Sequence, residues 1–224
     1  MRRVKVVLRG NPSLFLSTLS DVLVKLGFEL PQMVGDVKTF NIDIHVENPD
    51  VAIIDIESDH ADRSLADAHA MRLKTPSLGI VFLSSFYDQR MVGIKQEMAP
   101  QDSLLIIKPR VNDISEIREA LINAAHNRVR KGDAFHFSTV QLENRSNLTD
   151  RQVALLREIA MGFSNLQMAK VRGVSVNAVE NAISRLAKKL EVPRLEHINQ
   201  RVTLAALYYR GRGRFRDEQD VLEA

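Results

Sequence analysis

Short apolar runs alternate with longer amphipathic stretches through the first half of the chain. Continuous apolar runs of this length are typical of parallel strands buried on both faces, and the stretches between them have helical spacing. The runs predict strands at 4–8, 50–56, 78–83 and 104–107, with a weaker candidate at 29–34 that Pro31 interrupts. The intervening stretches predict helices at 12–26, 37–45, 61–73, 87–97 and 112–130. This alternation predicts a doubly wound α/β domain with a five-stranded parallel sheet, whose functional crevice lies at the carboxyl ends of the strands.

A purely helical pattern follows in the last third of the chain. Thr149 and Gln152 have the spacing of a capping box, which predicts the start of a first helix. A second, short helix is predicted at 165–171, and Gly173 ends it. Ser175 can cap a third helix. Helix, short helix, turn and helix is the layout of a helix-turn-helix domain, so an all-α domain of this kind is expected after the α/β domain.

The third helix, over residues 174–190, has one apolar stripe at helical period, formed by Val179, Ile183, Leu186 and Leu190. At about 100° per residue, Asn181, Ser184 and Lys188 fall opposite the stripe, with Arg185 beside them. The stripe predicts packing against the rest of the domain and leaves the polar face free. A fourth helix is predicted at 194–209, with Ile198, Val202, Ala205 and Ala206 toward one side.

Charge is distributed unevenly between these two parts. The 224 residues carry a formal net charge of +3. Residues 1–125 hold 14 Lys and Arg against 17 Asp and Glu, a net of −3, whereas residues 126–224 hold 17 against 11, a net of +6. A basic C-terminal part favours a polyanionic partner. The chain has no cysteine, so disulfides and thiolate metal sites are excluded, and no apolar run of membrane-spanning length, so we expect a soluble cytoplasmic protein.

Three polar residues stand where predicted strands end. Asp55 ends the third strand, Ser84 the fourth and Lys108 the fifth. A carboxylate nucleophile, a hydroxyl and a cation gathered in one crevice suit the acceptance of a phosphoryl group. A P-loop, a glycine-rich nucleotide fingerprint and a nucleophile–base arrangement are not found in the sequence, so an enzyme is not expected.

These segments resemble known families. DVAIID, VFLSS and IIKP resemble the matching segments of a response-regulator receiver domain, and LTDRQ, GFSN, MA and KKL resemble the LuxR-type DNA-binding domain of the NarL/FixJ branch. The resemblance implies a two-component response regulator with a CheY-like fold in its first domain. It places a receiver-like domain at 1–130, a linker at 131–146, a LuxR-type helix-turn-helix domain at 147–209 and a basic, then acidic, tail at 210–224.

The receiver resemblance fails at the metal pocket. A working receiver carries two acidic residues at the end of its first strand, which hold Mg²⁺ together with the acceptor Asp, but Arg9 and Gly10 stand there in this chain. Mg²⁺ requires oxygen ligands, and arginine offers no acceptor. We therefore expect no Mg²⁺, no other metal or cofactor, and no conventional phosphorylation of Asp55. Arg9 or Lys108 is expected to pair with Asp55 instead, giving a pseudo-receiver pocket of Arg9, Gly10, Asp55, Ser84 and Lys108.

The LuxR-type resemblance implies how the third helix meets double-stranded DNA. It places Glu180, Asn181 and Ser184 at base edges, while Arg185, Lys188 and Lys189 suit phosphates. Glu180 is a departure, because this position is commonly Lys in the branch. The fourth helix either forms a homodimer or completes the core of its own domain.

The sequence thus predicts an orphan or atypical response regulator, a DNA-binding transcription regulator whose receiver-like domain is controlled without conventional phosphorylation. A regulatory protein or a small-molecule effector is expected to act on that domain. The alternative is a protein-binding adaptor that works through its pseudo-receiver, with weak or no DNA binding. Glu180 favours the adaptor, whereas Asn181, Lys188 and the basic C-terminal part favour the regulator.

Overall fold

The chain forms two compact units, each assembled from two pieces of sequence. The computed structural model describes residues 2–10, 14–30, 33–34, 48–56, 61–134, 136–137, 139–140, 146–193 and 199–211. The first unit contains Met1–Ser85 and Ile94–Arg145, and the second contains Phe86–Gly93 and Ser146–Ala224. The predicted helix at 37–45 and residues 212–224 of the predicted tail lie outside the described residues.

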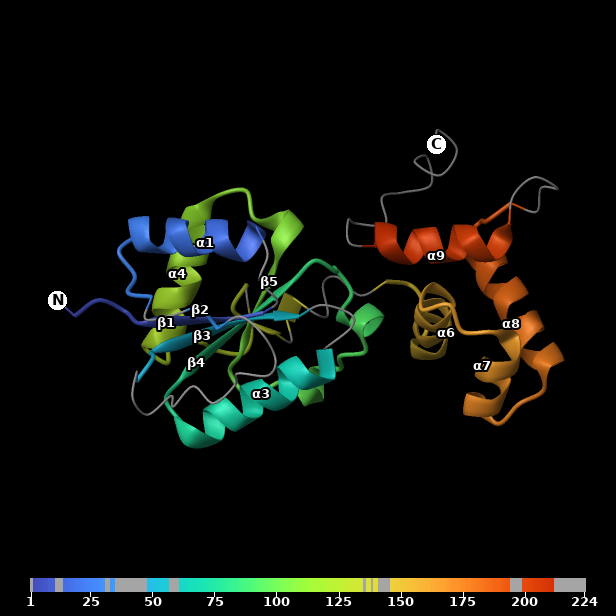
Figure 1. Cartoon of the computed structure of the whole chain (residues 1–224), viewed down its shortest axis with the longest axis horizontal. Helices are drawn as coiled ribbons and strands as arrows, with labels where there is room; N and C mark the ends of the chain where they lie inside the picture. Colours follow the sequence, from blue (N-terminus) through green and yellow to red (C-terminus); the bar gives the residue numbers. More distant parts are fainter. Residues whose placement is uncertain are drawn as a thin grey trace. The chain divides into compact units, whose positions relative to one another are not determined.

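The first unit is built on a parallel sheet in the order β2-β1-β3-β4-β5 (Figure 1). Its strands are β1 (Val6–Arg9), β2 (Met33–Val34), β3 (Val51–Ile56), β4 (Gly79–Ser84) and β5 (Leu104–Ile107). This strand order is that of the flavodoxin-like doubly wound fold, so the predicted receiver-like architecture is confirmed. The weaker strand candidate survives as the two residues of β2, preceded by a single parallel bridge between Lys5 and Glu29.

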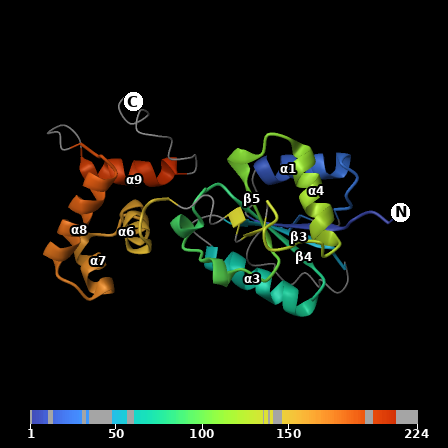
Figure 2. The same cartoon turned by 180° about the vertical axis from the view of Figure 1, so that it is seen from behind.

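Helices cover both faces of this sheet. Figures 1 and 2 show α1 (Leu14–Lys25) and α4 (Ile114–Ala125) on one face and α3 (Ala61–Lys74) on the other. The core beneath α1 and α4 is largely aliphatic, with buried side chains that include Leu19, Leu23, Ile53, Leu83 and Leu121. Gly79 lets α4 approach β4 closely, because a β-carbon at this position would lie 2.7 Å from the carbonyl of Ala124. α4 ends earlier than predicted, at Ala125, and Asn127 follows with a φ of 51°.

The prediction of a helix at 87–97 is wrong. Two short 3₁₀ helices occupy this stretch, η1 (Gln89–Val92) and η2 (Gln96–Met98). Asp88 caps η1, and Gly93 ends it in the left-handed conformation with a φ of 84°. An α-helix cannot continue through that backbone geometry. The part up to Gly93 also belongs to the second unit, so residues 1–130 are not one uninterrupted domain.

Part of the predicted linker at 131–146 packs on the first unit instead. His136 forms an antiparallel bridge with Leu104, and the amide of Phe137 donates to the carbonyl of Ser103 at 2.9 Å. The ring of Phe137 packs edge-on against Phe82, with ring centroids 5.6 Å apart. The stretch lacks clear periodicity, which predicted a linker, but apolar contacts of this kind hold it against the first unit. The boundary between the units falls after Arg145, close to the predicted start of the helix-turn-helix domain.

Besides η1, the second unit contains four α-helices in its described residues. They are α6 (Asp150–Ala160), α7 (Asn165–Arg172), α8 (Val176–Lys189) and α9 (Gln200–Arg210). The order and type agree with the predicted helix-turn-helix domain, although α9 begins later than expected and residues 194–198 lie outside the description. The buried side chains of α9 are Leu204, Leu207 and Tyr208, whereas Val202 is 64% exposed. None of the described helices in either unit is long and apolar enough to cross a membrane.

Candidate DNA-reading helix and receiver-like crevice

Side-chain caps fix where each helix of the second unit begins. The hydroxyl of Thr149 accepts from the amide of Gln152 at 3.3 Å, and the Gln152 side chain accepts from the amide of Thr149 at 2.9 Å. This confirms the predicted capping box. Ser175 accepts from the amide of Ala178 at 3.2 Å and caps α8, as predicted. Each such cap contributes roughly 1 kcal/mol to helix stability.

The turn between α7 and α8 depends on one glycine. Gly173 has a φ of 64° and ends α7 in the left-handed conformation. Its amide donates back to Lys170 at 3.3 Å. A residue with a β-carbon would be strained here, so the sharp turn that separates the two helices follows directly from the sequence.

The two faces of α8 have opposite character. Val179, Leu186 and Ala187 are buried against the domain. Asn181, Arg185 and Lys188 are exposed, and Ser184 is half-buried. These four polar residues line a hollow of about 470 Å³ together with Val192 and Gln200. Two cations and three neutral polar side chains around one hollow suit an extended polyanion.

Glu180 is exposed and takes part in a hydrogen-bond network with other side chains of its own domain. Its carboxylate accepts from the side-chain amide of Asn165 at 3.4 Å. The side-chain oxygen of Asn165 accepts from Arg201 at 2.7 Å, and Arg201 also donates to the carbonyl of Phe163. The network joins α7, α8 and α9. A residue expected at a base edge therefore has partners within its own domain.

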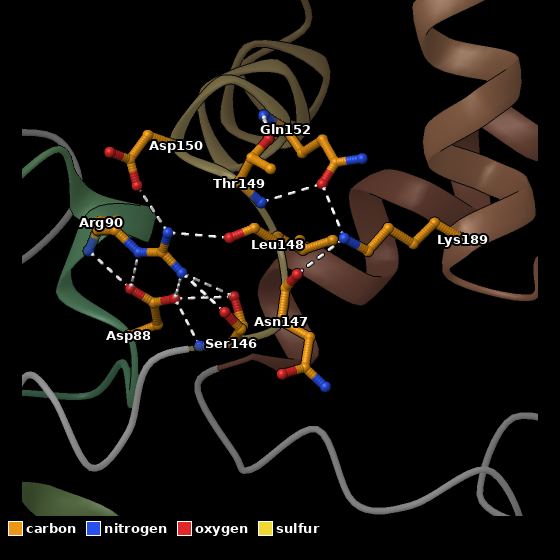
Figure 3. Close-up of polar contacts among 9 residues, drawn as sticks. All are labelled: Asp88, Arg90, Ser146, Asn147, Leu148, Thr149, Asp150, Gln152 and Lys189. Atoms are coloured by element: carbon orange, nitrogen blue, oxygen red, sulfur yellow. Dashed lines mark hydrogen bonds and ion pairs between the residues drawn. The ribbon is translucent and has the colours of Figure 1, made fainter.

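Lys189 also has partners inside the domain. Its ammonium donates to the carbonyl of Asn147 at 2.8 Å and to the side-chain oxygen of Gln152 at 3.1 Å (Figure 3). The end of α8 is thereby fastened to the start of α6. The lysine expected at a phosphate is engaged in holding two helices together.

In the first unit, the carboxyl edge of the sheet brings Asp55 and Lys108 together. The Nζ atom of Lys108 lies 2.6 Å from Oδ1 of Asp55, which confirms one of the two predicted pairings. Both side chains are largely buried, at 15% and 9% exposed for Lys108 and Asp55. The same ammonium lies 4.8 Å from the ring centroid of Phe15, within the range of a cation–π contact. Ser84, fully buried, ends β4 between the two strands that carry the pair.

Arg9, the other predicted partner of Asp55, binds a carboxylate on α3. Its guanidinium binds Asp67 on α3, with Nε and Nη2 at 3.1 and 2.5 Å from the same carboxylate oxygen. The side chain of Arg9 is only 7% exposed, and a charge buried to this degree needs such a partner. Of the two predicted partners of Asp55, Lys108 forms the ion pair, and Arg9 is paired with Asp67.

Gly10 leaves no room for an acidic side chain beside Asp55. A β-carbon at position 10 would lie 2.9 Å from Cβ of Asp55 and 2.8 Å from Leu16. The residues present therefore do not fit Mg²⁺: one position carries a paired arginine, the next has no space, and Asp55 is bound to Lys108. Within the described part of the chain, three His, Asp or Glu side chains do not come together as metal ligands.

Comparison with known proteins identifies the helical unit. Residues 146–201 match the family model described as bacterial regulatory proteins, luxR family. This segment is a LuxR-type helix-turn-helix domain. A receiver-like sheet followed by such a domain is similar to the arrangement in response regulators of the NarL/LuxR type.

Relatives extend the similarity beyond this domain. The response regulator protein VraR of Staphylococcus saprophyticus is 25% identical over 194 residues, covering 83% of this chain and 86% of VraR. VraR of Staphylococcus aureus is 24% identical over 199 residues with the same coverage. A structure of RcsB from Salmonella enterica serovar Typhimurium has a TM-score of 0.51 at 13% identity, covering 92% of this chain and 99% of that one. This last likeness is one of fold.

The LuxR-type domain also contacts residues from an earlier part of the chain, which the sequence did not predict. Asp88 and Arg90, in the stretch wrongly predicted as helix, form an ion pair with 2.7 Å between Oδ2 and Nη2 and bind the residues that lead into α6 (Figure 3). Burial acts to raise the pKa of Asp88, but hydrogen bonds from Arg90 and Ser146 outweigh it, and the pKa is lowered. Burial acts to lower the pKa of Arg90, but Asp88 and Asp150 outweigh it, and the pKa is raised. Nothing in the local sequence signals these contacts, because their partners lie 56–60 residues away.

Proposed function

We propose that this chain is a response regulator that binds double-stranded DNA through the exposed face of α8 and regulates transcription. The observation that carries the proposal is one helix face on which Asn181, Arg185 and Lys188 are exposed, opposite a buried apolar stripe. A helix presented in this way fits the major groove. Structures of the fold neighbour RcsB include a complex with DNA, at a TM-score of 0.52 and 13% identity.

The polar residues of α8 divide into two roles in this proposal. Asn181 and Ser184 contact base edges, because a side-chain amide or hydroxyl recognises donors and acceptors in the groove. Arg185 and Lys188 contact phosphates, which position the helix without reading sequence. Glu180 and Lys189, first expected at DNA, instead position α8 through Asn165 and Asn147.

Selection from a library of random DNA duplexes tests DNA reading. The full-length chain is expected to enrich a motif, and the Asn181→Ala variant is expected to lose preference at a position within it. A matched control is Arg2→Lys, which changes an exposed ion pair in the first unit. Recovery of unselected sequence by the wild-type chain would contradict the proposal and favour the adaptor.

The adaptor alternative depends on Glu180 as an acidic charge facing the DNA backbone. Glu180 is exposed on α8, and its carboxylate accepts a hydrogen bond from Asn165 of the same domain. The exposed cations Arg185 and Lys188 remain on the same helix.

The receiver-like unit is proposed to act without Mg²⁺-dependent phosphorylation of Asp55. The arguments are the lack of space at Gly10, the Arg9–Asp67 pair and the Lys108–Asp55 pair. A regulatory protein or a small-molecule effector would then supply the signal. Incubation with a small phosphodonor and Mg²⁺, followed by mass spectrometry, is expected to leave Asp55 unmodified while a receiver with a complete acidic pair is modified in parallel. Stoichiometric phosphorylation of Asp55 would overturn this part of the proposal.

A homodimer formed by α9 completes the proposed function. Val202, Ala206 and Tyr209 are exposed at a spacing that places them on one face of the helix. Val202 and Tyr209 are 64% and 49% exposed, which is unusual for large apolar side chains that share a face. A two-fold contact through this face would bury them and match a palindromic DNA site.

A further inference from the structure

A short piece of chain far from the LuxR-type domain in sequence is built into it. Phe86–Gly93 belongs to the second unit, although the residues on both sides of it belong to the first. Phe86, Met91 and Val92 are almost fully buried. The hydroxyl of Tyr208 on α9 donates to the carbonyl of Met91 at 2.8 Å, and the rings of Phe86 and Tyr208 lie 5.4 Å apart. The piece therefore supplies part of the core of the second unit.

Arg90 binds the segment that leads into α6. Its Nε and Nη2 donate to the two carboxylate oxygens of Asp88 at 2.9 and 2.7 Å. Its remaining donors reach the carbonyl of Leu148 at 2.9 Å, the carboxylate of Asp150 at 2.7 Å and the carbonyl of Ser146 at 3.0 Å. Each N–H of the guanidinium is thus directed at an oxygen, an arrangement that a lysine cannot reproduce.

Asp88 binds the same segment as a hydrogen-bond acceptor. Its Oδ2 accepts from the amide of Ser146 at 3.0 Å and from its hydroxyl at 2.8 Å. The Asp88 and Arg90 side chains are only 5% and 9% exposed. Removing one of the two would leave the other charge buried without its main partner, which is strongly unfavourable.

Lys189, at the end of α8, binds the same short segment from the opposite side. Figure 3 shows Lys189 reaching Asn147 and Gln152 while Arg90 reaches Ser146 and Leu148. Residues 146–149 therefore lie between a cation from η1 and a cation from α8. The position of the segment determines where Lys189 finds its acceptors, and so where the end of α8 is fastened.

We propose that Asp88 and Arg90 are positioning residues of the LuxR-type domain, and that this domain is complete only with Phe86–Gly93. The pair orders residues 146–149, and these residues in turn hold α8 through Lys189. The effect on the local structure stands independently of DNA binding. The effect on DNA affinity rests on the proposed function of α8.

Amide hydrogen exchange on the full-length chain tests the structural part. Arg90→Ala and Arg90→Lys are compared with Arg2→Lys, an exposed arginine paired with Asp50 in the first unit. Loss of hydrogen bonds to buried charged groups predicts exchange faster by on the order of tenfold at residues 86–93 and 146–153. Strands β3 and β4 should exchange as in the wild type. Unchanged exchange at 146–153 in both Arg90 variants would overturn the inference.

Affinity for a DNA duplex, measured with the same variants, tests the link to α8. Arg90→Ala and Lys189→Met are each expected to weaken binding, and the double variant should lose less than the product of the two separate losses, because both act on residues 146–149. Unchanged affinity in Arg90→Ala despite faster exchange would overturn the link to α8. A wild-type chain that binds no duplex, with exchange still responding to Arg90, refutes the proposed function while supporting the positioning role.

Discussion

Gly10 lies so close to Asp55 that a β-carbon at position 10 would come within 2.9 Å of the aspartate's own Cβ. At this point the backbone of Gly10, just after β1, lies against the side chain of Asp55 near the end of β3. The space where a second carboxylate would have to stand is filled by Leu16 and Asp55. Asp55 is also paired with Lys108 at 2.6 Å, so its carboxylate already has a cationic partner.

Restoring an acid at position 10 should therefore fail to restore a metal site. Gly10→Asp is expected to destabilise the first unit by roughly 1–3 kcal/mol, because overpacking forces neighbouring atoms to shift. Added Mg²⁺ should not recover the loss. Chemical denaturation with and without Mg²⁺ measures both effects, and Gly10→Ala serves as the control for the steric part alone. Stabilisation of Gly10→Asp by Mg²⁺ would show that the crevice has room for the cation.

Many of the secondary-structure elements could be predicted from the sequence because their signals are local. The apolar runs gave β3, β4 and β5 to within one residue, and the capping residues Thr149 and Ser175 lie where they were expected. Apolar periodicity and capping act over a few residues, so one sequence carries them in full. The ion pair of Lys108 with Asp55 was also predictable, because parallel strands bring their carboxyl ends to one edge.

The errors arise where distant residues decide the outcome. The stretch at 87–97 has an amphipathic pattern, but Phe86, Met91 and Val92 are buried in a unit whose other residues begin at Ser146. The hydrogen bonds that join Glu180 to Asn165 and Lys189 to Asn147, on other segments of the fold, were likewise not predicted. A charged residue on a helix face is predicted to be exposed, but its position alone does not indicate which neighbouring group forms a hydrogen bond with it.

On α8, a phosphate contact and a base contact should respond differently to substitution. Lys188→Ala is expected to weaken binding to all duplexes and to reduce the slope of affinity against salt by about one, since fewer counterions are released. Asn181→Ala should relax preference at one base pair and cost roughly 1–3 kcal/mol on the selected site only. Titrations of selected and scrambled duplexes at several salt concentrations separate the two. Equal losses on both duplexes for both variants would refute this division of roles.

The lowered pKa of Asp88 makes the second unit sensitive to acid. Because the folded-state pKa lies below the ordinary value of 3.8, the ionised carboxylate contributes stability at pH values above 3.8. That contribution is lost as the pH falls from there through the folded-state pKa, when the carboxyl becomes protonated. Asp88→Asn should therefore lower the stability of the second unit at neutral pH and flatten its decline in acid. Unfolding followed from pH 7 to pH 2 measures this.

Asp150→Asn provides the matched control for the acid experiment. Asp150 also binds Arg90, at 2.7 Å, but its side chain is 63% exposed. Exposed ion pairs contribute little, so this variant should keep the acid profile of the wild type. An identical acid profile for Asp88→Asn and wild type would mean that the Asp88 carboxylate does not stabilise the unit.

The exposed face of α9 predicts the effect of a charge on dimer formation. Val202→Asp is expected to weaken self-association, because a carboxylate would be buried without a partner in a two-fold contact. The fold should persist, since Val202 is 64% exposed within the chain. Val24→Asp on α1 is the matched control, because Val24 is 57% exposed on the first unit. Sedimentation velocity over a range of concentrations, with and without the selected duplex, should show a shift toward monomer for Val202→Asp alone. If both variants sediment as the wild type does, α9 does not form the dimer and its apolar face needs another partner.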